Sequence, residues 1–241
     1  MKAKILVAGL ALAAAAPAFA SYTTVDISTY VNGSVAIAPD SFPIGTSTGN
    51  QGSGIPFQTA PNPNDPSLMG TWLAPSDNAS LVVDLSGLDI TGQASFYALL
   101  NNYYGTPGAD EYNITITATN GDHVSYMSIG GVDTRDYNQN VFTNTIASTT
   151  FPWFDNGHPD PQRLDLREFT LPTSFAADTI ASFTITQNNN GDIALFSGLT
   201  FSDEPIVTSV PEPGSLAMLL AGVGMLAVGA RRRWPGRRAD R

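Results

Sequence analysis

Few residue groups in this chain could do chemistry, and each of them also has an ordinary explanation. Residues 45–49 read Gly-Thr-Ser-Thr-Gly and match the G-x-S-x-G pattern of a serine nucleophile. That chemistry requires a sharp strand-to-helix turn with a histidine and an acid within reach. Here the pattern lies in a stretch rich in Gly, Ser and Thr, with no predicted helix after it. We therefore interpret Ser47 as a chance match, and the sequence indicates no catalytic residue.

Metal ligands are equally sparse. His123 and His158 are the only histidines, neither stands in a zinc-binding arrangement, and the absence of cysteine excludes thiolate sites and disulfides. Asp155, Asn156 and Asp160 could supply oxygen ligands for Ca²⁺ from one loop. Asp-Asn-Gly and Pro-Asp are also ordinary turn sequences, so both interpretations stay open. Calcium is the one cofactor that the residues suggest.

Positive charge is nearly absent from the body of the chain. Between residues 21 and 209, three arginines (Arg135, Arg163 and Arg167) stand against nineteen acidic residues, which gives a net charge of −16. Nucleic acids and anionic lipid surfaces are excluded as partners, because phosphate binding needs clustered cations. We expect the arginines to form carboxylate clamps that fix strand ends. The candidate acids are Asp133, Asp136, Asp165 and Glu168, and the first two are also a second candidate calcium pair.

Aromatic side chains are the remaining candidates for binding. Trp72, Tyr103, Tyr104, Trp153 and Phe154 could stack on sugar rings, but aromatics also dominate the cores of β-sandwiches. Tyr103 and Tyr104 precede a glycine at a predicted strand end, where a binding loop would lie. They are therefore the candidate sugar contacts, and the others are predicted to be core residues.

The elements that position these residues are predicted to be short β-strands. Thr, Ser, Asn, Gly and aromatics are abundant, helical periodicity is nearly absent, and turn residues separate alternating runs. Residues 39–66 are predicted to be mostly loop. The predicted strands cover 22–27, 34–38, 54–57, 70–74, 79–85, 93–100, 112–119, 123–129, 141–146, 164–169, 179–186 and 193–201. This pattern indicates an all-β fold, an antiparallel β-sandwich or jelly roll over residues 21–209.

One hairpin is especially clear. Asn120-Gly121 separates two alternating runs. This dipeptide predicts a two-residue turn with both residues at positive φ.

The first twenty residues have the three parts of a secretory signal peptide. Lys2 and Lys4 precede an apolar run at residues 5–16, and Pro17-Ala18-Phe19-Ala20 ends in a small-x-small pattern. Signal peptidase is expected to cut between Ala20 and Ser21 after the export machinery engages this signal helix.

The last thirty-two residues form a second targeting signal. Residues 210–214 (Val-Pro-Glu-Pro-Gly) cannot extend a helix. Residues 215–230 carry no charge, and the tail at 231–241 begins with an arginine cluster. A sixteen-residue helix spans roughly 24 Å, short for a bilayer core of about 30 Å. We expect a marginal transmembrane helix with a cytoplasmic stop at Arg231, Arg232 and Arg233. A core helix of a soluble domain is the alternative.

Pro211, Glu212 and Pro213, the apolar helix and the arginine cluster together resemble the C-terminal signal of PEP-CTERM proteins. The resemblance implies processing by an exosortase, a membrane enzyme with a cysteine nucleophile. The protein would be held in the inner membrane before processing and then reach the cell surface or extracellular matrix. It also implies a role in the cell envelope or in an exopolysaccharide biofilm.

A second resemblance concerns residues 80–202, whose strands and turns are similar to galactose-binding-like jelly rolls. The motifs include Asn101-Asn102-Tyr103-Tyr104-Gly105 and residues 130–137. Members of that fold often bind sugars, but the fold alone does not define a ligand.

Three functions follow from the sequence. The first is a non-enzymatic structural or adhesive envelope protein. The second is a carbohydrate-binding module acting on matrix polysaccharide, and the third is a secreted hydrolase.

Overall fold

The computed structural model describes residues 20–34, 42–138, 145–147, 149–157, 162–188 and 191–204. The chain divides into a unit at residues 1–205 and a second at 206–241. The predicted signal helix and the whole predicted C-terminal targeting signal, residues 210–241, lie outside the described residues. Among the described residues, no helix has the length and apolarity to span a membrane.

The described chain is built almost entirely of strands, with one 3₁₀ helix, η1 (Thr173–Ala177). The strands are β1 (Tyr22–Val25), β2 (Gly45–Ser47), β3 (Phe57–Thr59), β4 (Pro61–Asn62), β5 (Asp65–Met69), β6 (Trp72–Leu73), β7 (Ser80–Asp84), β8 (Ser95–Tyr103), β9 (Asp110–Ala118), β10 (His123–Ile129), β11 (Thr150–Asp155), β12 (Arg163–Thr170), β13 (Ile180–Gln187) and β14 (Ile193–Ser202).

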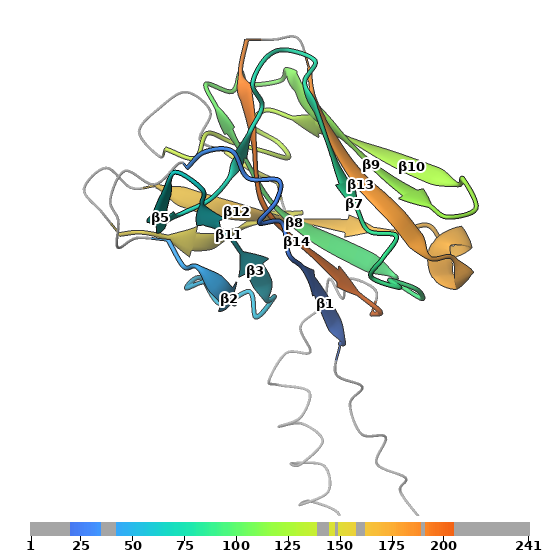
Figure 1. Ribbon diagram of the computed structural model, residues 1–241. Coiled ribbons are helices and arrows are strands. Elements are labelled where there is room, and N and C mark those ends of the chain that lie inside the picture. Colours follow the sequence, from blue (N-terminus) through green and yellow to red (C-terminus); the bar gives the residue numbers. More distant parts are fainter. Residues whose placement is uncertain are drawn as a thin grey trace, which may run out of the picture. The chain divides into compact units, whose positions relative to one another are not determined.

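Two antiparallel sheets make up most of the fold (Figure 1). One has the order β1-β14-β8-β12-β11 with β6 beside β14, and the other has the order β10-β9-β13-β7. Aromatic rings pack between them. Phe183 of β13 stacks on Phe196 of β14 at 4.9 Å, and Tyr126 of β10 meets Phe169 of β12 edge-on at 5.1 Å. The predicted all-β antiparallel sandwich is confirmed.

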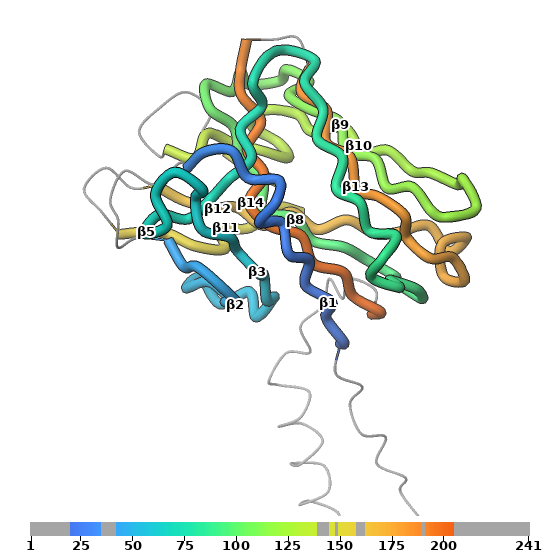
Figure 2. Tube along the Cα trace, in the orientation of Figure 1, coloured from blue at the N-terminus to red at the C-terminus, as the bar shows by residue number. Residues whose placement is uncertain are grey.

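The central strands β8 and β14 are buried along nearly their whole length. In a strand that is covered on both faces, successive side chains are all buried, whereas in a strand covered on one face buried and exposed side chains alternate. The four-stranded sheet covers one face, and the segment that carries β2 and β3 covers the other (Figure 2). There Phe57 packs edge-on against Trp153, and Thr200 donates to Pro56 O at 2.6 Å.

This covering segment corrects one prediction. Residues 39–66 were predicted to be mostly loop, yet they contain β2, β3 and β4, and β5 begins there. The strands are two to five residues long, and contacts distant in sequence hold the segment in place, such as Trp153 Nε1 donating to Ile55 O at 3.1 Å. Local sequence contains no signal for such pairing. Strand β11 was missed for the same reason.

Most other strand predictions are confirmed within a few residues, and β10 matches at both ends. The described ends of two predicted strands, residue 34 and residues 145–146, are not strand, and the remainder of both lies outside the described residues. The predicted strand at 54–57 is wrong, because β3 starts only at Phe57.

The β9–β10 hairpin exists, but its turn differs from the prediction. Gly121 has φ +93°, whereas Asn120 has a negative φ. Gly121 N donates to Ala118 O at 3.0 Å, and Ala118 N donates to Asp122 O at 2.8 Å. The loop is therefore the longer kind, a turn followed by a left-handed glycine. Asn120 contributes its side chain instead, accepting from Asp122 N at 2.8 Å.

We expect Gly121→Ala to lower the free energy of unfolding by about 1–2 kcal/mol, because φ +93° is strained for any residue with a Cβ. Gly87→Ala is the matched control: no heavy atom lies within 4 Å of either added methyl group, but Gly87 has no positive φ. Urea unfolding of both variants separates backbone strain from packing. Equal losses at the two sites would contradict this explanation.

Candidate functional site

Three tyrosines gather at the end of β8. Tyr103 stacks on Tyr137 with ring centroids 5.3 Å apart, and it meets Tyr104 edge-on at 4.0 Å. Tyr137 is buried and Tyr103 half-buried, while Tyr104 is 48% exposed. The two predicted sugar contacts are thus adjacent at the surface, and the structure adds Tyr137 behind them. We call these three residues the tyrosine cluster.

Tyr104 has an uncommon backbone conformation. Its φ is +65°, which is a strained value for a bulky side chain. Asp136 Oδ2 accepts from Tyr104 N at 2.9 Å and holds the backbone there. Such strain persists only where surrounding structure fixes it, and it is concentrated at functional sites. The exposed ring is therefore held in a defined position rather than left on a free loop.

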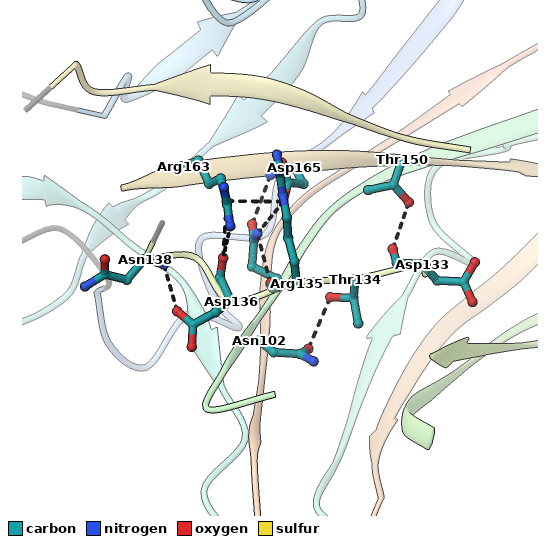
Figure 3. Close-up of polar contacts among 10 residues, drawn as sticks. Asn102, Asp133, Thr134, Arg135, Asp136, Asn138, Thr150, Arg163 and Asp165 are labelled. Carbon is teal, nitrogen blue, oxygen red and sulfur yellow. Dashed lines mark hydrogen bonds and ion pairs between the residues drawn. The ribbon is translucent and has the colours of Figure 1, made fainter. Parts of the chain in front are cut away.

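A network of charged and polar side chains connects β8 and β12 to the segment that precedes Tyr137 (Figure 3). Asp165 of β12 has no exposed surface and binds Arg135 through both carboxylate oxygens, each at 2.7 Å. Asn101 Nδ2 also donates to Asp165 at 2.8 Å, and Arg163 lies 3.9 Å from it. The predicted bidentate clamp is confirmed, with Asp165 as its acid.

The same network positions the segment that carries Tyr137. Arg163 donates to Asp136 O from two nitrogens, at 3.1 and 3.2 Å. Asn102 N donates to Arg135 O, and Tyr137 N donates to Asn102 O, both at 3.0 Å. Burial is the main influence on two of the charges: it raises the pKa of Asp136 and lowers that of Arg163 to about 10. Residues 135–137 are therefore bonded to β8 and β12 on both sides.

The third arginine is also inside. Arg167 forms an ion pair with Asp133 at 3.2 Å, donates to Met127 O at 3.0 Å and to Ser128 Oγ, and lies over the Phe169 ring. Among the described residues, Glu168, the other predicted partner, forms no ion pair with the three arginines. Since residues 21–209 contain no lysine, the described surface has almost no cationic side chain to offer.

A buried pair of carboxyl groups lies near the loop that follows Tyr104. No sequence pattern indicated this pair. Glu111 has no exposed surface, Asp192 is 5% exposed, and their carboxyl groups are in hydrogen-bonding contact. The side-chain amide of Gln187 bonds on both sides: Nε2 donates to Asp192 Oδ1, and Oε1 accepts from Ala194 N at 2.5 Å. Burial raises the pKa of Asp192.

The carboxyl pair is connected to the loop after Tyr104. Thr106 N donates to Glu111 Oε1 at 2.7 Å. A Cβ at Gly130 would lie 2.1 Å from that same oxygen, so the end of β10 can approach only as glycine. Glu111 therefore connects the loop after Tyr104 to β9 and to the end of β10, and Asp192 is connected to β14 through Gln187.

The remaining candidates are placed as follows. Trp72 and Trp153 are buried core residues. Ser47 Oγ accepts from Gly49 N at 3.1 Å, and β2 leads to β3 rather than to a helix. His123 is exposed on β10. His158 lies outside the described residues.

The predicted calcium loop is described only in part. Asp155 Oδ1 accepts from Gly157 N at 2.8 Å, and Asn156 Oδ1 accepts from Gln162 N at 3.0 Å, which is turn chemistry. Asp160 lies outside the described residues. Within the described part of the chain, no three acidic or histidine side chains are grouped as metal ligands. Calcium stays a prediction.

The carboxyl pair predicts a pH dependence of stability. The folded pKa of Asp192 is above the unfolded value of about 3.9, so the folded domain binds this proton more tightly. The stability it contributes is complete below about pH 4 and is lost as pH rises through the folded pKa. We expect the melting temperature of Asp192→Asn to fall less steeply than that of the wild type between about pH 4 and pH 8.

Asp65→Asn is the control for this measurement. Hydrogen bonds from Ser67 lower the pKa of the exposed Asp65, so it does not titrate in that range. Equal slopes for the wild type and Asp192→Asn would contradict a raised pKa of Asp192 in the folded domain.

Comparison with known protein families finds a match for one segment of the chain. Residues 209–233 match the PEP-CTERM protein-sorting motif. No curated protein matches the chain. The matched residues include the Pro-Glu-Pro tripeptide, the apolar run and the three arginines predicted to stop transfer. The chain thus carries an exosortase-substrate sorting signal, which implies an exported protein that is anchored in the membrane before processing.

Proposed function

We propose that this is a non-catalytic structural or adhesive protein of the cell surface or extracellular matrix, released there by an exosortase that acts on its C-terminal signal. The match of residues 209–233 to the sorting motif is the observation that carries the proposal. Signal peptidase, the export machinery and, transiently, the inner membrane are its other partners. An exopolysaccharide biofilm is the setting in which such a protein would act.

The described charges support a non-catalytic role. The acids that contact arginines, Asp133, Asp136 and Asp165, make hydrogen bonds and ion pairs that connect strands and turns. Ser47 is bonded within its own turn and has no strand-to-helix geometry around it. These groups have structural tasks, and a hydrolase would require a constellation that they do not form.

Carbohydrate binding is the second candidate, and Tyr104 favours it. An exposed ring fixed in a strained conformation beside Tyr103 suits the C–H face of a sugar. The similarity of residues 80–202 to galactose-binding-like jelly rolls supports the same reading. Because no lysine and no exposed arginine is available, a neutral glycan fits this surface better than one bearing uronates or sulfates.

The sorting role is tested in the full-length chain. Glu212→Ala combined with Pro213→Ala should leave a longer, membrane-retained protein, because the exosortase recognition residues are gone. Immunoblots of membrane and released fractions measure this. The control is Glu204→Gln with Thr208→Ala, two changes that precede the matched residues 209–233. Unchanged processing of the first variant would refute the assignment of the sorting signal.

Sugar binding is tested with a glycan array on the exported protein. Tyr104→Gly should reduce binding to any retained glycan about five- to a hundredfold, if a sugar gains as much from the ring as a stacked nucleic-acid base does, on the order of 1–3 kcal/mol. Glycine adopts φ +65° without strain, so this variant removes the ring and keeps the loop. Phe151→Ala removes another exposed ring, 39% accessible on β11, and should bind as the wild type does. A blank array would eliminate this second function and leave the first.

A further inference from the structure

The residue that precedes the first strand, Ser21, is hydrogen-bonded to the carboxylate of Asp203. Ser21 N donates to Asp203 Oδ1 at 2.8 Å, and Asp203 N donates back to Ser21 O at 3.4 Å. These contacts continue the register of β1 with β14, in which Tyr22 lies opposite Ser202. Asp203 is exposed, and β1 is a four-residue strand at the sheet edge.

The nitrogen in this contact is the atom that signal peptidase would liberate. In the precursor it is a neutral amide with one hydrogen, which Asp203 already accepts. Hydrolysis of the Ala20–Ser21 bond consumes one water and leaves a carboxylate on Ala20 and an amine on Ser21. With an ordinary pKa of about 8, that amine is mostly protonated at neutral pH. The hydrogen bond from a neutral amide to the Asp203 carboxylate would thereby become an ion pair between an ammonium group and that carboxylate.

The surroundings favour a positive charge at this position. Asp203 and Glu168 both act electrostatically on Tyr22, the next residue of β1, and Tyr97 packs edge-on against its ring. Glu204 follows Asp203 directly. Arg163 and Arg167 are buried, and the partly buried Arg135 is paired with Asp165, so none of the three arginines pairs with Asp203. The new ammonium group would be the one cation at an acidic end of the domain.

We propose that Asp203 is the binding site for the α-ammonium group of Ser21, formed when residues 1–20 are removed. The bond pins the edge strand β1 to β14 in the mature protein. In the precursor the donor is an uncharged amide, whose hydrogen bond to the carboxylate is weaker than the ion pair, so removal of the leader stabilises the first strand of the fold. This inference rests on cleavage after Ala20 and is independent of sorting by the exosortase.

The test compares chains that differ only at the amino terminus, each carried through residue 241 in detergent. One begins at Ser21 and the other at a Gly-Ser extension before Ser21. Exposed ion pairs are modest, so we expect the melting temperature of the first to be higher by about 1–3 °C at low salt. Asp203→Asn keeps an oxygen acceptor but loses the charge, and it should abolish the difference between the two chains. About 1 M salt should abolish it too.

Asp77→Asn is the control for removal of one negative charge, because Asp77 is exposed on the β6–β7 loop. It should leave the difference between the two chains intact. Equal melting temperatures for the two wild-type chains, or a difference that persists in Asp203→Asn, would overturn the proposal. Mass spectrometry of the exported protein provides a separate check: a first residue other than Ser21 would also overturn it, while leaving the sorting signal untouched.

Discussion

The burial of Asp165 with two arginines is the interaction on which the rest of the described structure depends. A carboxylate without exposed surface is stable only if it is paired and hydrogen-bonded, and Arg135, Arg163 and Asn101 meet that requirement. These partners come from β8, β12 and the segment after β10, so one charge joins three parts of the chain. Removing one partner of a buried pair typically costs about 3–5 kcal/mol. The tyrosine cluster rests on this junction.

The same arrangement determines what the exterior can contact. Residues 21–209 carry nineteen acidic side chains and no lysine, and their three arginines are engaged with Asp133, Asp136 and Asp165, so the exposed charge is dominated by acids. A net charge of −16 over residues 21–209 opposes long-range attraction of polyanions. It also means that a single ammonium group added by processing changes the local electrostatics more than it would on a surface of mixed charge.

The sequence predicted those parts of the fold that depend on neighbouring residues. The alternation of Tyr112, Ile114 and Ile116 with polar residues was enough to place β9, and the pairing of the arginines followed from the scarcity of cations. The short strands of the covering segment and the Glu111–Asp192 pair could not be found, because their partners are far away in sequence. Tyr103 and Tyr104 were identified by their place at a strand end. Nothing local indicated that Tyr137 would stack behind them.

The register of the central sheet shows where the Ser21–Asp203 contact and the tyrosine cluster lie along the strands. Ser95 and Tyr22 lie opposite Ser202, whereas Tyr103 lies opposite Ile193 at the other end of β14. Eight residues of strand separate these ends by roughly 26 Å. The described chain therefore enters and leaves the domain side by side at one end, and the tyrosine cluster lies at the other.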